Sequence, residues 1–457
     1  MMKVAAPFLS AVLVLSLASP VEAGDPGPGC DPVRPALAHH AGGEALPIQP
    51  SDAPIPCVSE VGPAIEGATI GVTSSGAVFF ASIEQIPLPS RVIVEPSVVA
   101  RSTDLGASWD FIIPGDLPTS PHGSLSTWLR VDPETDRVWY ATPTAPCGAT
   151  VSWSDDDGET WETFPNVGCP AQGASALIEG PVPPGGEPLT GDYPHVVYYC
   201  ANAAEQPLRD SSVLMCYRSL NGGHTWSWIG STPDPIPAPE GCDATHFRAT
   251  RAGEVGTDGV LYFPTYSCDD TLLGMAVSDD EGATWTRHEV LTTEIQDLYP
   301  PALGIDEENN LFLAWKGPGG LPYLAVSTNQ AQDWSEPMMI APPEVNVIRR
   351  LAIVARDEGH IVVSYLGSTD GGESFHAYIT ESRNALGGSP VFWSAPINDP
   401  EIPVLLATSS ETFANRIQLL RGHIADDGTP WAAFHCYDTD LCPGLRTGLA
   451  GRLQRPE

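Results

Sequence analysis

The chain has 457 residues, and its 57 acidic and 21 basic side chains give it a net charge of −36. Such an acidic surface repels phosphate backbones, so the composition argues against nucleic acid as a partner. The ten cysteines form an even set without a C-x-x-C pair, which favours disulfides over a metal site.

Residues 1–23 have the pattern of an export signal. Lys3 supplies a positive charge, residues 4–17 form an apolar stretch too short to span a bilayer, and Val21 and Ala23 offer small residues for cleavage after Ala23. No later segment approaches the roughly 20 consecutive apolar residues of a membrane helix. We therefore expect no membrane span and a secreted or periplasmic protein, which begins with an N-terminal extension over residues 24–54.

One short pattern, Ser-x-Asp/Asn-x-Gly-x-Ser/Thr-Trp, recurs along the chain. Its four complete copies end at Trp109, Trp161, Trp226 and Trp285, and a fifth copy that ends at Trp334 has lost its glycine and its hydroxyl residue. The Asp or Asn side chain can accept bonds from backbone N–H groups ahead of it, glycine takes a positive φ, and Trp fills the space between sheets. These carboxylates are therefore predicted to hold tight turns and not to catalyse a reaction.

Each of these turns lies among four short predicted strands. Around the fifth copy the strands are residues 301–305, 311–315, 321–327 and 334–340. Four strands in about fifty residues are typical of a β-propeller blade. When the strands are called A to D from the inside outward, the repeated turn joins C to D.

The last part of the chain predicts two further blades. The sixth covers residues 349–396, and its stretch 368–375 imitates the repeat but falls between strands B and C, which predicts an ordinary hairpin. The seventh has three strands, at residues 416–424, 431–437 and 444–453, and lacks a strand D.

An N-terminal strand at residues 55–61 can complete the seventh blade and close the ring. We therefore predict an all-β fold over residues 55–457, a single seven-bladed propeller of four-stranded antiparallel blades. A six-bladed ring with a C-terminal appendage is the alternative.

The blade register also predicts how the cysteines pair. Loops B–C and D–A emerge on the same face of a propeller, and neighbouring strands bring further cysteines together. The expected disulfides are all local: Cys30–Cys57, Cys147–Cys169, Cys200–Cys216, Cys242–Cys268 and Cys436–Cys442.

With these repeats the chain resembles the Asp-box, or BNR-repeat, sialidase-like β-propeller superfamily. The resemblance covers about residues 60–400 and rests on the four complete repeats. It implies the fold but not one activity, because relatives include sialidases, other glycoside hydrolases, polysaccharide lyases and non-catalytic receptors and assembly factors. A sialidase-like enzyme would place an arginine in the first blade, whereas residues 64–72 contain none.

Binding sites on propellers lie where the inner A strands begin. Counting back about a dozen residues from the A–B turns places Arg248, Tyr299, Arg349 and Arg416 at these positions. Three guanidiniums around one funnel repel each other unless an anion or nearby carboxylates compensate them. They are therefore candidate substrate-binding residues for the carboxylate of an anionic sugar, and salt bridges between blades are the alternative.

Three carboxylates, Asp243, Asp297 and Glu411, lie in the loops just before these strands and are candidate catalytic residues. Tyr299 or His246 can act as nucleophile or base, and Asp297, Asp243 or Glu411 can act as proton partner.

Three classes of function stay open. They are a sialidase-like glycoside hydrolase, a lyase for uronate polysaccharides that uses His246 and Tyr299, and a non-catalytic binding or scaffold propeller. The missing arginine of the first blade favours the third class over a true sialidase, whereas the funnel of arginines and Tyr299 favours an enzyme. We expect a carbohydrate ligand, a monomer and no cofactor, and the acidic run at residues 155–157 leaves a structural calcium open.

Overall fold

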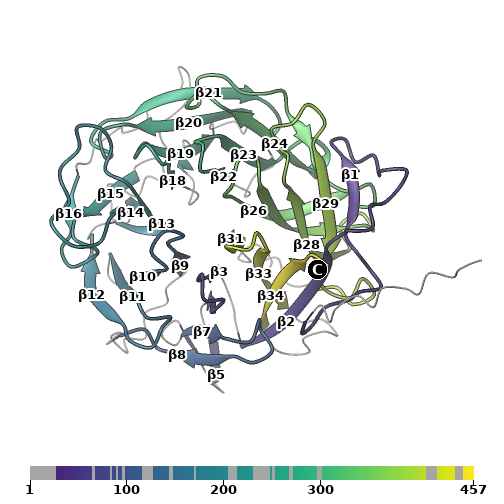
Figure 1. Ribbon diagram of the computed structural model, residues 1–457, viewed down its shortest axis with the longest axis horizontal. Coiled ribbons are helices and arrows are strands. Elements are labelled where there is room, and N and C mark those ends of the chain that lie inside the picture. Colours follow the sequence, from purple (N-terminus) through teal and green to yellow (C-terminus); the bar gives the residue numbers. More distant parts are fainter. Residues whose placement is uncertain are drawn as a thin grey trace, which may run out of the picture.

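The computed structural model describes residues 27–63, 67–82, 85–88, 91–94, 98–115, 127–143, 148–168, 171–203, 214–229, 248–249, 253–266, 271–295, 301–407, 419–437 and 446–456. In this part of the chain seven sheets stand around a common axis, and a small separate hairpin adds two more strands (Figure 1). The structure confirms the predicted seven-bladed propeller, so the six-bladed alternative is wrong.

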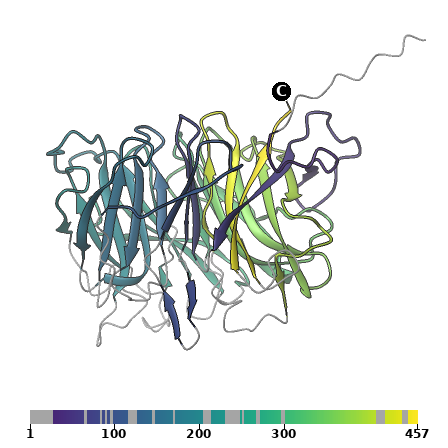
Figure 2. The same ribbon diagram turned by 90° about the horizontal axis from the view of Figure 1, so that it is seen from below.

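Each blade is an antiparallel sheet whose strands A to D follow one another from the axis outward (Figure 1), and the side view shows the strands running between the two faces of the ring (Figure 2). Blade 1 consists of β3 (Ala68–Val72), β4 (Val78–Ser82), β7 (Val98–Ser102) and β8 (Asp110–Ile112). Blade 2 consists of β9 (Trp128–Val131), β10 (Val138–Pro143), β11 (Ala149–Ser154) and β12 (Glu162–Val167). Blade 3 consists of β13 (Ala171–Gly180), β14 (Val196–Ala203), β15 (Leu214–Ser219) and β16 (Ser227–Trp228). The separate hairpin lies between β4 and β7 in the chain and consists of β5 (Gln85–Leu88) and β6 (Arg91–Val94).

In blade 4 two short strands lie at the inner edge of the described sheet. Blade 4 consists of β17 (Arg248–Ala249) with β18 (Glu254–Val255), β19 (Leu261–Tyr266), β20 (Leu272–Ser278) and β21 (Thr286–Thr292). Blade 5 consists of β22 (Ala302–Ile305), β23 (Leu311–Lys316), β24 (Pro322–Ser327) and β25 (Met338–Met339). Blade 6 consists of β26 (Val347–Ala355), β27 (Ile361–Ser368), β28 (Ser374–Ser382) and β29 (Val391–Pro396). A short strand β30 (Leu405–Leu406) also pairs with β28, and the 3-10 turn η2 (Pro318–Gly320) joins β23 to β24.

Blade 7 is built from both ends of the chain. Its strands are β32 (His423–Ile424), β33 (Pro430–Tyr437), β34 (Arg446–Gln454) and the N-terminal β2 (Ile55–Pro63). β2 pairs antiparallel with β34, so the N-terminal strand supplies the missing strand D and closes the ring as predicted (Figure 1). β31 (Leu419–Arg421), just before β32 in the chain, pairs in parallel with β3 of blade 1, so blades 7 and 1 are also joined where the ring closes.

A second N-terminal strand, β1 (Leu37–His40), adds to the outside of blade 6 by pairing with β29. The disulfide Cys30–Cys57 joins the segment before β1 to β2 and confirms one predicted pair. Cys200–Cys216, which links neighbouring strands of blade 3, confirms a second.

Three predicted pairs involve residues outside the described part of the chain. Cys436 is disulfide-bonded, but Cys442 and the pairs Cys147–Cys169 and Cys242–Cys268 lie outside it, as does the export signal at residues 1–23. No helix in the described ranges is long and apolar enough to cross a bilayer.

The repeated turns bond as the sequence predicts. In the second copy, the Gly158 N–H donates to Ser154 Oγ at 2.8 Å, and the Thr160 N–H and Oγ1 donate to Asp156 at 2.8 and 2.7 Å. The other copies repeat the central bonds, with Asn329 replacing Asp and Ala331 taking a φ of 64° in the fifth. Because these carboxylates accept several hydrogen bonds within their own turns, they have a structural role.

The stretch 368–375 joins strands B and C, as predicted, but it is not an ordinary hairpin. The Gly372 N–H donates to Ser368 Oγ at 2.8 Å, and the Ser374 N–H and Oγ donate to Asp370 at 3.0 and 2.6 Å. These are the bonds of the repeated turn, and buried Phe375 stands where the other copies have Trp. The prediction was wrong because this hydrogen-bonding pattern depends on local residues and not on which two strands the turn joins.

The repeated turns also pack against the preceding blade. A Cβ added at Gly158, whose φ is 80°, would lie 2.8 Å from Cε1 of buried Phe79 in blade 1. We expect Gly158→Ala to lower the free energy of unfolding by about 3 kcal/mol, of which about 1–2 kcal/mol comes from the backbone and the rest from the clash. Equilibrium denaturation measures the change.

Gly76→Ala is the matched control for this substitution. Gly76 has a φ of 85°, and no heavy atom would lie within 4 Å of its added Cβ, so only the backbone cost of about 1–2 kcal/mol applies. Equal losses in the two variants would contradict packing of the turn against blade 1.

Candidate functional site

The two faces of the ring carry different connections. Because strands A to D alternate in direction, the A–B turns and the C–D repeated turns share one face, which we call the turn face. The B–C and D–A connections share the other, which we call the loop face, and the A strands begin there. The sequence-predicted site belongs to the loop face.

Most of the predicted site residues cannot be placed. Six of them lie outside the described residues: Asp243, His246, Asp297, Tyr299, Glu411 and Arg416. The backbone of Arg248 begins β17 opposite Tyr266, in agreement with the predicted register, although its side chain is also outside the described part. Arg349 is the one predicted site residue whose side chain the structure describes.

Arg349 lies at the loop-face end of β26, next to an irregularity in that strand. The pairing of β26 with β27 shifts between Arg349 and Leu351, and Arg350 between them has a φ of 48°. A positive φ costs free energy in a residue with a side chain, and such bulges are frequent beside functional sites. The Arg349 guanidinium carbon lies 4.5 Å from the centre of the Phe375 ring, so a cation–π contact holds this side chain in place.

A third cation lies beside these two arginines. Lys316 ends β23 in blade 5 and is buried. Burial disfavours its charged form, and the charges of Arg349 and Arg350 disfavour it further, which lowers the pKa of Lys316 to about 8. We call Lys316, Arg349 and Arg350 the basic cluster.

Sequence reasoning identified only one member of the basic cluster. Lys316 carried a visible signal, since it is the only lysine after Lys3 in the whole chain. Arg350 carried no such signal, because no sequence pattern marks the bulge that keeps two consecutive arginines at one rim.

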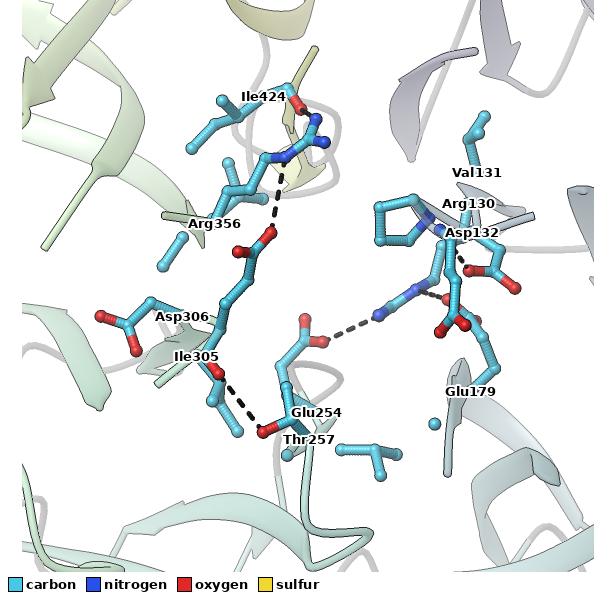
Figure 3. Close-up of a pocket in the computed structure, with 18 of the residues that line it drawn as sticks. Arg130, Val131, Asp132, Glu179, Glu254, Thr257, Ile305, Asp306, Arg356 and Ile424 are labelled. Atoms are coloured by element: carbon cyan, nitrogen blue, oxygen red, sulfur yellow. Dashed lines mark hydrogen bonds and ion pairs between the residues drawn. The ribbon is translucent and has the colours of Figure 1, made fainter. Parts of the chain in front are cut away.

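The turn face holds a cavity that sequence reasoning missed. It has a volume of about 340 Å³, lies where the A strands end, and is lined by residues of several blades (Figure 3). Its wall includes one aliphatic side chain from each of five inner strands: Val131, Val255, Ile305, Val354 and Ile424.

Four charged side chains of opposite signs alternate along one side of this cavity. Arg130 donates from Nε to Glu179 and from Nη1 to Glu254 Oε2 at 2.8 Å, and Arg421 pairs with the other oxygen of Glu254. The side chains come from β9, β13, β18 and β31, so they connect distant parts of the ring. We call the sequence Glu179–Arg130–Glu254–Arg421 the charge chain.

The two ends of the charge chain differ from its middle. Glu179 is 2% exposed, and among the described residues its Oε2 has no hydrogen-bond partner. Burial raises the pKa of Glu179, and the charge of Arg130 opposes this effect. Arg421, at the other end, is 16% exposed and lines the cavity.

Two histidines on the cavity lining have pKa values shifted in opposite directions. Burial alone would lower the pKa of His195, but its bonds to Asp132 at 3.0 Å and Glu134 at 2.8 Å raise it to about 9. Burial, followed by the charges of Arg421, Arg356 and Arg130, lowers the pKa of His423 to about 3. Asp132 and Glu134 thus lie beside blades 2 and 3, whereas Arg356 and Arg421, which pair with Asp426 and Glu254, lie beside blades 6 and 7.

The acidic run at residues 155–157 is engaged in protein contacts. Asp155 accepts two bonds from Arg137, at 2.5 and 2.6 Å, and Asp156 accepts the bonds of the repeated turn. The described residues contain no group of three His, Cys, Asp or Glu side chains that could hold a metal ion.

No protein-family model and no curated protein matches the chain. Solved structures similar to it include a lectin of Aleuria aurantia in complex with Fucα1-6GlcNAc, at 10% identity and a TM-score of 0.43 over 73% of this chain and 97% of that one. An α-L-arabinanase of Penicillium chrysogenum complexed with arabinobiose has 14% identity and a TM-score of 0.44 over 76% and 99%. A leech intramolecular trans-sialidase has 14% identity and a TM-score of 0.41 over 83% and 66%. These names describe those proteins and the ligands they carry.

Proposed function

We propose that the protein is a secreted propeller of the sialidase-like type that binds an anionic carbohydrate at the loop face. The observation that supports this most directly is the basic cluster, in which Lys316, Arg349 and Arg350 lie close enough for the two arginines to lower the pKa of the lysine.

Clustered cations repel each other, and a bound anion relieves that repulsion. An arginine fork donates two parallel hydrogen bonds to a carboxylate, and this arrangement is stronger than bonds between neutral groups. The Phe375 contact holds the Arg349 side chain in place before a ligand arrives, which reduces the entropy lost on binding. A sugar carboxylate is therefore the ligand group that the basic cluster fits best.

Arg349→Ala tests this proposal. We expect the variant to bind a sialylated or uronate-bearing oligosaccharide about tenfold more weakly than the unchanged chain, because one carboxylate-binding fork is lost. Calorimetric titration measures the affinity, with a neutral oligosaccharide of equal length for comparison. Arg34→Ala is the control, because Arg34 pairs with Asp31 in the N-terminal segment and has the same charge.

Two results would contradict the proposal: unchanged affinity in Arg349→Ala, or equal affinity for the neutral oligosaccharide. The products of a longer incubation separate the classes of function. A hydrolase releases new reducing ends, a lyase releases unsaturated products that absorb in the ultraviolet, and a binding protein releases neither.

The pKa of Lys316 predicts how binding depends on pH. Its ammonium is charged below a pKa of about 8 and neutral above it. The contribution of Lys316 to anion binding should therefore be complete near pH 6.5 and should disappear as the pH rises to about 9.5. Affinity measured across this range should fall, and Lys316→Arg, which stays charged, should remove most of the fall. A pH profile that is the same in both proteins would contradict a role for Lys316.

A further inference from the structure

The charge chain in the cavity of the turn face is an open sequence of alternating charges. Its inner members are satisfied on both sides, because Arg130 bonds both Glu179 and Glu254, and Glu254 bonds both arginines. Its ends are a carboxylate, Glu179, and a guanidinium, Arg421. Each end therefore has opposite charge on one side only.

The two ends line the same cavity. Burial raises the pKa of Glu179 and Asp132 raises it further, whereas the charges of Arg130 and Arg421 favour its ionised form. Glu179 Oε2 has no partner in the described part of the chain although it is buried, and a buried acceptor without a donor costs free energy. A ligand that donates to Oε2 would remove this cost.

The balance of charge limits which ligand fits. The charge chain contains two carboxylates and two guanidiniums, so a buried ligand with one net charge would leave an uncompensated charge beside it. A ligand that carries an ammonium and a carboxylate on adjacent atoms would bond both ends and keep the total unchanged. The open chain would then become a closed ring of alternating charges.

We propose that this cavity binds a small zwitterion of the α-amino-acid type, whose ammonium donates to Glu179 and whose carboxylate accepts from Arg421. The aliphatic wall of Val131, Val255, Ile305, Val354 and Ile424 takes an apolar side chain of the ligand. The site lies on the face opposite the basic cluster, so this inference goes beyond the proposed carbohydrate function and does not depend on it.

The field across the cavity agrees with this orientation. Asp132 and Glu134 lie on the side of blades 2 and 3, where their bonds raise the pKa of His195 and its imidazolium offsets one of the two carboxylates. Arg421 lies on the opposite side, where burial first and then the charges of Arg421, Arg356 and Arg130 lower the pKa of His423. The ammonium of a zwitterion is thus drawn toward Glu179 and its carboxylate toward Arg421.

A ligand series on the unchanged full-length protein tests the proposal. L-leucine carries both charges, 3-methylbutylamine lacks the carboxylate, and 4-methylpentanoate lacks the ammonium, while all three keep the same branched apolar end. Calorimetric titration should show leucine binding at least about tenfold more tightly than either single-charge compound. Leucine should also raise the melting temperature of the protein.

Variants locate the binding in the cavity. Glu179→Gln and Arg421→Gln should each weaken leucine binding at least about tenfold, since each removes the charge at one end of the charge chain. Glu307→Gln is the matched control, because Glu307 lines the same cavity but is 62% exposed and lies outside the charge chain. Circular dichroism establishes that each variant is folded, and the ligand series remains decisive where one is not.

Each contrary outcome overturns the proposal. Absence of heat and of a thermal shift with about 10 mM leucine would show that no zwitterion binds with a millimolar Kd or better. Binding of the amine or of the carboxylate as tightly as leucine would make this a cation site or an anion site instead. Leucine binding that survives Glu179→Gln would place the ligand elsewhere. None of these results affects the test with acidic oligosaccharides, which depends on Arg349.

Discussion

Replacing Glu254 with alanine is expected to lower the free energy of unfolding by about 3–5 kcal/mol. The carboxylate of Glu254, only 7% exposed, is the shared partner of Arg130 and Arg421. Its removal leaves the guanidiniums of Arg130 and Arg421, which are only 10% and 16% exposed, without a counter-charge between them. The free energy of unfolding falls because two cations lose their shared counter-charge. This holds even if apolar residues of similar size would stabilise the fold as well as the intact charge chain does.

Equilibrium denaturation compares this variant with Glu159→Ala. Glu159 also pairs with an arginine, Arg101, but its side chain is 67% exposed. Solvent-exposed ion pairs contribute about 0–1 kcal/mol, so this control should change stability little. Losses of similar size in both variants would mean that the charge chain is solvated and does not connect the blades.

Deleting residues 24–63 is expected to prevent the protein from folding cooperatively. The deletion removes β2, so blade 7 loses its outer strand and β34 becomes an open edge. It also removes β1 from the outside of blade 6. Gel filtration and thermal denaturation of the purified chain should show aggregation or a broad transition in place of one sharp transition.

A shorter deletion, of residues 24–36, is the control. It keeps β1 and β2 but removes Cys30, and therefore the disulfide that closes a segment of 27 residues. The entropy of closing such a loop is worth about 3 kcal/mol, so this chain should still unfold in one transition at a lower temperature. A single sharp transition in the longer deletion would mean that the ring does not need its N-terminal strand.

Much of the fold could be predicted because its determinants are local and repeated. Each copy of the pattern that ends at Trp161 or its equivalents sets a C–D turn, and the spacing of these turns sets the blades. The N-terminal closure followed from counting strands, since the last three lacked a fourth. The same counting misjudged residues 368–375, because strand order says where a turn lies but not how its side chains bond.

Less of the candidate site could be predicted, because it depends on contacts between residues far apart in sequence. The partners Arg130 and Glu254 are 124 positions apart and belong to no recurring motif. The ion pair between them forms because the curvature of the ring brings their blades together, and the sequence of a single strand does not predict that curvature. Counting from the A–B turns did reach the neighbourhood of Arg349, but it could not reveal the bulge that keeps Arg350 at the same rim.

The way in which β2 completes blade 7 sets how far apart in the sequence the two strands that close the ring lie. β2 ends at Pro63, and its partner β34 begins at Arg446, so the first long strand among the described residues pairs with the last of them. Every intervening strand is made while the edge of β2 has no native partner. Contacts between distant positions form slowly because a long loop must close first. We therefore expect ring closure to be the slow step of folding, with β2 an open edge until β34 pairs with it.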